Sequence, residues 1–124
     1  MQKTNYRTYN HARSSITNVN ANTGYALVTP AENVRGCIVR RASFANSITA
    51  AGALQASILC KSAAPATVID GDVLALSVPT YGDPSAYHMH GMIEDVFVPA
   101  GLGVYFVSAQ ATVRLHTAII AELL

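Results

Sequence analysis

The segment VFVPAGLGVYFVS, residues 96–108, carries the clearest structural pattern in the chain. Two apolar runs, residues 96–98 and 104–108, flank the turn sequence Pro-Ala-Gly-Leu-Gly. Proline fixes one backbone angle and the two glycines accommodate positive φ, so the chain is expected to reverse direction here. Val, Phe and Tyr favour strands on both sides of the turn. The segment therefore predicts a β-hairpin and a fold built from antiparallel strands.

Similar short apolar runs, separated by turn residues, continue on both sides of this segment. They predict strands at residues 25–29, 34–44, 54–62, 73–78, 87–98, 104–108 and 112–124. Helices over residues 48–59 or 115–124 are the alternative, but Gly52 and a lack of charged helix formers weaken the first. Strands that recur about every ten residues are typical of β-sandwiches. We predict an all-β fold, an antiparallel β-sandwich or jelly roll over residues 24–124.

Residues 1–23 have a different composition and are predicted to form an extended N-terminal arm. They are rich in Asn, Thr and Ser, and they contain three cations, Lys3, Arg7 and Arg13, and no carboxylate. The remaining residues hold five cations against seven carboxylates. A positive arm on a slightly negative body suits docking on a neighbouring molecule, although a flexible polar terminus is the alternative. Tyr6, Arg7, Tyr9 and Arg13 are the predicted arm contacts, because Tyr suits half-buried interfaces.

The composition of the whole chain also points to association. Its 124 residues are enough for one domain, and only 12% of them are charged. An ordinary soluble domain is about 25% charged. We expect that much of this weakly charged surface is covered by other protein subunits, including copies of the same chain.

His88 and His90 are two potential metal ligands at the spacing of one face of a strand. Residues i and i+2 of a strand point to the same face, so the two imidazoles are expected to lie together. Two nitrogens are too few for a metal site in a monomer, whereas six around a three-fold axis of an oligomer would be enough for an octahedral metal. We predict an interface role instead, with no metal or cofactor. Cys37 and Cys60 fall in separate predicted strands and are expected to be buried free thiols rather than a disulfide.

The sequence contains none of the common catalytic patterns, and we predict that the protein is not an enzyme. It has no Gly-x-Ser-x-Gly elbow and no phosphate-binding Gly-rich loop. Glu94 and Asp95 are neighbours in a predicted strand and should point to opposite faces, as should Arg40 and Arg41. Each arginine is expected to pair with one of the carboxylates Glu32, Glu94 and Glu122. The three arm cations would bind nucleic acid only weakly, so a nucleic-acid partner is not expected.

Membrane insertion and secretion are not expected either. The start MQKTNYRTYN lacks the apolar region of a signal peptide. The two uncharged stretches, residues 42–60 and 96–113, are interrupted by polar residues or by Pro and Gly.

Residues 94–108, a strand that ends in a Pro-Ala-Gly turn followed by an aromatic-containing strand, resemble a hairpin of small tailed-bacteriophage virion proteins. Residues 111–124 are similar to the closing strand of such β-sandwiches. The resemblance implies a structural component of the virion, assembled in the bacterial host cytoplasm, with major capsid or other virion proteins as partners. A head decoration (cement) protein is the function we expect. The alternatives are a tail- or baseplate-associated subunit and a surface carbohydrate-binding module.

Overall fold

The described residues form strands joined by turns and loops, and none of them lies in a helix. The computed structural model describes residues 14–48, 52–53, 55–77, 80–81, 88–110 and 112–124, and it describes side chains over part of these ranges. The elements are β1 (Ser14–Val19), β2 (Tyr25–Val28), β3 (Cys37–Ile48), β4 (Gly52–Ala53), β5 (Ala56–Lys61), β6 (Asp72–Ser77), β7 (Thr80–Tyr81), β8 (His88–Val98), β9 (Gly103–Ser108) and β10 (Thr112–Leu123). The predicted all-β class is confirmed.

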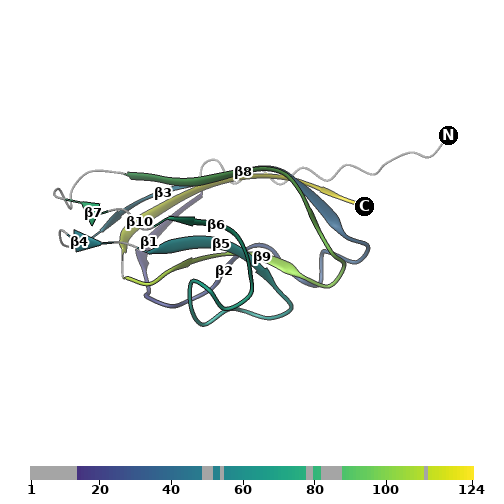
Figure 1. The fold of residues 1–124 in the computed structure, drawn as a ribbon, viewed down its shortest axis with the longest axis horizontal. Coiled ribbons are helices and arrows are strands. Elements are labelled where there is room, and N and C mark those ends of the chain that lie inside the picture. Colours follow the sequence, from purple (N-terminus) through teal and green to yellow (C-terminus); the bar gives the residue numbers. More distant parts are fainter. Residues whose placement is uncertain (1–13, 49–51, 54, 78–79, 82–87, 111) are drawn as a thin grey trace.

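Eight of these strands form two antiparallel four-stranded sheets that are stacked face to face (Figure 1). Sheet A has the order β1-β10-β3-β8 and sheet B has the order β2-β9-β5-β6, while β4 and β7 form a small separate pair. Counted along the eight long strands, these orders are first-eighth-third-sixth and second-seventh-fourth-fifth. This is the strand order of a jelly roll, in which consecutive strands repeatedly cross between the two sheets.

The body of the sandwich begins earlier in the chain than the sequence predicts. Residues 14–23 were expected to belong to the arm, but β1 (Ser14–Val19) is the edge strand of sheet A and pairs antiparallel with β10. The ladder runs from the pair Ser14 and Thr117 to the pair Val19 and Thr112. The edge position explains the error, because an edge strand pairs through its backbone on one side only and does not need the apolar sequence of a central strand. The predicted arm is thereby reduced to residues 1–13, which lie outside the described residues.

The turn at residues 99–102 reverses the chain, but it does not close a hairpin within one sheet. Strand β8 pairs with β3 in sheet A, whereas β9 lies between β2 and β5 in sheet B. Gly101 has a φ of 81°, as the turn sequence predicts. The side-chain amide of Asn33 donates to the carbonyl oxygens of Val98, Pro99 and Leu102 at 3.4, 2.8 and 2.9 Å. These bonds connect Asn33 to the end of β8 and to the turn that follows it.

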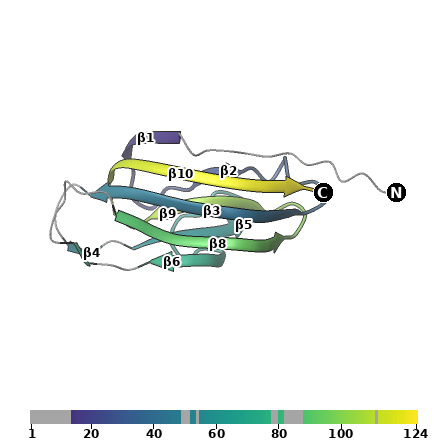
Figure 2. The ribbon, with the colours of Figure 1, turned by 90° about the horizontal axis from the view of Figure 1, so that it is seen from above.

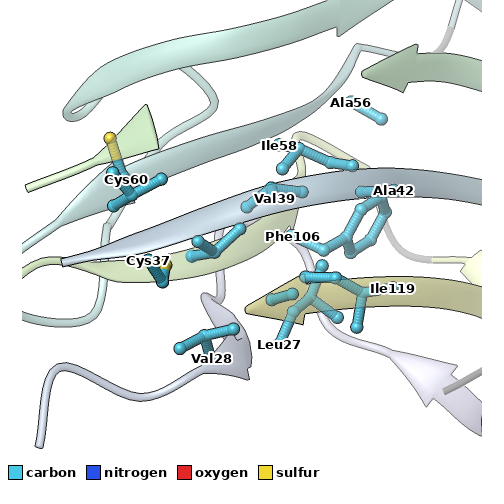
Figure 3. Packing of buried hydrophobic residues seen from close by; sticks show 13 residues of the cluster. Leu27, Val28, Cys37, Val39, Ala42, Ala56, Ile58, Cys60, Phe106 and Ile119 are labelled. Carbon is cyan, nitrogen blue, oxygen red and sulfur yellow. The ribbon is translucent and has the colours of Figure 1, made fainter. Parts of the chain in front are cut away.

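The core lies between the two sheets and contains residues from both of them (Figure 3). Val39 and Ile119 from sheet A and Ile58 and Phe106 from sheet B have no exposed surface. The prediction of buried free thiols is confirmed, because Cys37 of β3 and Cys60 of β5 are both buried and unpaired. Burial, with a smaller contribution from Cys60, raises the pKa of the Cys37 thiol to about 11.

Candidate interaction surface

The outer face of sheet B is covered by a segment of the chain itself, residues 62–71. Outward side chains of this sheet, Leu59, Tyr105 and Val107, form a second buried cluster with Val68 of the covering segment. The hydroxyl of Ser57 donates to the carbonyl oxygen of Val68 at 2.7 Å, and both groups are buried. We call this side of the molecule the covered face.

Polar contacts of Asp70 hold the covering segment, one to Lys61 before the segment and one to Ala66 within it. Lys61 Nζ lies 2.6 Å from Asp70 Oδ2, and the backbone N–H of Ala66 donates to the same oxygen at 2.8 Å. The hydrogen bonds from Lys61 and from Ala66 lower the pKa of the Asp70 carboxyl group. The residues Thr67-Val68-Ile69 have strong strand propensity but lie in this loop, where Val68 packs against sheet B.

The outer face of sheet A has no such cover among the described residues (Figure 2). Its outward residues come from the three strands β3, β8 and β10. We call this surface the open face, and it consists of Ile38, Arg40, Arg41, Glu94, Asp95, Phe97, Ile120 and Glu122. It combines the three apolar side chains Ile38, Phe97 and Ile120 with two arginines and three carboxylates.

Arg40 lies at the centre of the open face and binds carboxylates on both neighbouring strands. Its Nε and Nη2 atoms donate to Glu122 Oε1 and Oε2 of β10 at 2.9 and 3.1 Å, and its Nη1 atom donates to Asp95 Oδ1 of β8 at 3.1 Å. These hydrogen bonds raise the pKa of the Arg40 guanidinium further above its ordinary value. The Asp95 side chain nevertheless remains 69% exposed and can accept a further donor.

A break in the strand alternation places the charged pairs on one surface. Arg40 and Arg41 are both exposed, between the buried residues Val39 and Ala42. The ladder of β3 with β10 shifts register at this point, where Ile120 opposes Arg41 and Ala121 opposes Val39. The predicted placement of the two arginines on opposite faces is therefore wrong, because a β-bulge adds one residue to β3.

The same correction applies to the facing pair on β8. Glu94 and Asp95 are both exposed, and Asp95 has a positive φ of 53°. A left-handed conformation is uncommon for a residue other than glycine, although Asp tolerates it better than most. The predicted ion pairing of Arg40 with Glu122 is confirmed, and Asp95 is a second partner that the sequence did not indicate.

Phe97 is the large aromatic side chain of the open face. It is 57% exposed, although Phe usually lies in a core. Its ring packs over Gly36, where an added Cβ would lie 2.9 Å from the ring atoms Cε2 and Cζ. Ile38 is its partner on β3, so an apolar area continues across the two strands. Ile120 of β10 is also exposed on this face.

The six contact residues that the sequence analysis predicted have side chains outside the described part of the structure. Tyr6, Arg7, Tyr9 and Arg13 lie outside the described residues. His88 and His90 lie in β8, and their side chains are also outside the described part. The β8–β3 ladder shifts register between the pairs Met92–Ser43 and Met89–Ala45, so regular alternation does not continue through His90. Their interface role stays a prediction.

The open face was not identified as one surface from the sequence, although part of the signal for it is present there. Arg40-Arg41 and Glu94-Asp95 are adjacent pairs of opposite charge in two strands that prove to be neighbours. Two adjacent charges in a half-buried strand are a signal for a bulge, because regular alternation would bury one of them. Strand pairing was needed to bring the two signals together.

Comparison with protein-family models, with curated proteins and with solved structures gives no match to this chain. In the part of the chain that the structure describes, no group of three or more His, Cys, Asp or Glu residues could hold a metal ion. The described residues also include no helix that is both long enough and apolar enough to cross a membrane.

Proposed function

We propose that this protein is a non-enzymatic structural component of a tailed-phage virion, which self-associates and reinforces the particle. A head decoration (cement) protein is the form of this role that we favour, with other virion proteins as partners. The arm then docks on a neighbouring subunit. The observation that carries the proposal is the open face, a sheet surface with exposed Phe97 and Ile120 that no described segment covers.

Three further features support this function. The charged fraction of 12% is low for a protein that is surrounded by water on all sides. The jelly-roll strand order is an architecture that viral capsid proteins use, although lectins and other proteins share it. The strand–turn–strand segment at residues 94–108 resembles segments of small tailed-phage virion proteins.

Size in solution is the first test of this proposal. Light scattering on the purified full chain should give a mass that rises with concentration and exceeds that of one chain. Electron microscopy of the concentrated sample should show rings, sheets or shells. A mass that stays at one chain up to the solubility limit would contradict self-association and with it the proposed structural role.

The second candidate is a surface carbohydrate-binding module, and the exposed ring of Phe97 favours it, since aromatic rings can stack on sugars. Lectins also use jelly rolls. This candidate predicts a monomer that binds glycans on an array, with binding lost in Phe97→Ser. The structural proposal predicts assembly without glycan and no signal on the array.

A further inference from the structure

We infer that the open face of one copy is the docking site for residues 1–13 of a second copy. This inference rests on the proposed function and specifies its contact surface. It names a head-to-tail contact, in which two different surfaces of the chain meet. Such contacts close into rings or continue into larger assemblies, as a reinforcing protein requires.

The position of the arm's attachment supports this contact. Ser14, the first described residue, pairs with Thr117 near the middle of β10, and β1 runs antiparallel to β10 at the edge of sheet A (Figure 2). The arm therefore joins the body at the edge of the sheet that carries the open face. Thirteen residues can extend to about 43 Å, which exceeds the length of a 12-residue strand such as β10, about 40 Å. An arm of this length can reach another molecule.

Charge complementarity is the second argument. The arm carries Lys3, Arg7 and Arg13 and no carboxylate. The open face holds the three carboxylates Glu94, Asp95 and Glu122 against the two arginines of β3. Asp95 is its most available acceptor, because one oxygen binds Arg40 while most of the side chain faces solvent. A second cation at Asp95 would form a charge-assisted hydrogen bond and fix the position of the arm.

Apolar complementarity is the third argument. Tyr6 and Tyr9 are the aromatic residues of the arm, and they flank the cation Arg7. On the open face Phe97 and Ile38 adjoin the exposed carboxylate Asp95, so each surface places apolar groups beside a charge, which is positive on the arm and negative on the face. Tyr residues are enriched in the centres of interfaces, where the ring is buried and the hydroxyl group keeps a polar partner.

Two full-length variants with complementary defects test this inference. The arm variant is Tyr6→Ser, Arg7→Ser, Tyr9→Ser, and the face variant is Asp95→Asn, Phe97→Ser. Asn is chosen at position 95 because it tolerates the positive φ of 53°. The matched control, Ile69→Ser, Asp72→Asn, removes an exposed aliphatic side chain and an exposed carboxylate on the other side of the sandwich.

Light scattering should show that each defective variant associates about tenfold or more weakly than the unaltered chain, as expected for loss of a central interface residue. The control variant should associate like the unaltered chain. An equimolar mixture of the arm and face variants should form a two-chain species, because the intact arm of one meets the intact face of the other. Circular dichroism and thermal melting verify that every variant folds.

The outcomes separate this inference from the proposed function. If the face variant assembles like the unaltered chain, the docking site is wrong, while the structural role survives. If both variants are monomeric and their mixture is also monomeric, the arm does not meet the face of another copy, and the inference is overturned. If the unaltered chain never assembles, the proposed function itself fails.

Discussion

The outer faces of the two sheets differ in how their apolar side chains are shielded. On sheet B, residues 62–71 fold back over the sheet and bury Leu59, Tyr105 and Val107 around Val68. On sheet A, Phe97 and Ile120 are left exposed beside the ion pairs of Arg40. A single chain thus completes one of its surfaces by itself and leaves the other without a described cover.

From this difference we expect the covered face to contribute to the free energy of folding and the open face to contribute to the free energy of association. Apolar area that the chain buries itself contributes to folding of the monomer, at about 25 cal/mol per Å². Apolar area that stays exposed contributes little until another molecule covers it. Substitutions of the buried side chains of the covered face should therefore lower the stability of the monomer, whereas substitutions on the open face should weaken its assembly.

The largest expected effect comes from a matched pair of truncations, one on each face. Leu59→Ala should lower the free energy of unfolding by about 2–5 kcal/mol, because it leaves a cavity under the covering segment. Phe97→Ala should lower the free energy of unfolding of the monomer by less than about 1 kcal/mol. Urea denaturation at a concentration where the chain is monomeric measures both. Equal losses for the two variants would remove the distinction between the faces.

The hydrogen bond under the covering segment is the second target. Ser57→Ala leaves the buried carbonyl group of Val68 without its donor and should cost about 1–3 kcal/mol. Hydrogen exchange should become faster in residues 62–71, while β3 and β10 keep their protection. An unchanged exchange rate in this segment would show that the bond does not hold the cover in place.

The two thiols between the sheets provide a pH-dependent test of the core. Burial raises the pKa of Cys37 to about 11, from the ordinary value of 9.0, and raises the pKa of Cys60 as well. The unfolded chain releases these protons first, so the unfolding free energy should fall between about pH 9 and 11 and keep its full thiol contribution below pH 9. A Cys37→Ala, Cys60→Ala variant should show a smaller decline. Denaturation curves across this range provide the comparison.

The smallest effect concerns Asp70, whose carboxyl pKa is lowered by Lys61 and by the N–H of Ala66. The contribution of Asp70 to the unfolding free energy is fully present above its ordinary pKa of 3.8. It is lost as the pH falls through the lower pKa of the folded state. The methyl resonances of Val68 should therefore shift towards their unfolded positions in acid. In Asp70→Asn this pH dependence should be absent, since the side chain no longer titrates.

The fold class was predictable from the sequence, because alternating apolar runs and turn residues are local signals. The strand order was not, since it depends on pairings between distant segments such as β1 with β10. The turn at Pro99 illustrates the limit. Its residues predict a reversal, but the sheet in which β9 lies depends on pairing with β2 and β5, which are far away in the sequence.

The candidate surface was predictable only in part. The adjacent charges at Arg40-Arg41 and Glu94-Asp95 are visible in the sequence, but regular alternation assigns each pair to two faces. A bulge in β3 and the positive φ of Asp95 place all four side chains in solvent. Phe97 was expected only as part of an apolar strand, because no local signal distinguishes an outward Phe from a core Phe.

Oxidative footprinting of the full chain below and above its assembly concentration tests the central claim most directly. Phe97 on the open face and Ile69 on the covering segment are both well exposed in the single chain, at 57% and 68%. On assembly, oxidation of Phe97 should fall severalfold while oxidation of Ile69 stays unchanged. Equal oxidation of Phe97 at both concentrations, or protection of Ile69 in its place, would contradict the account.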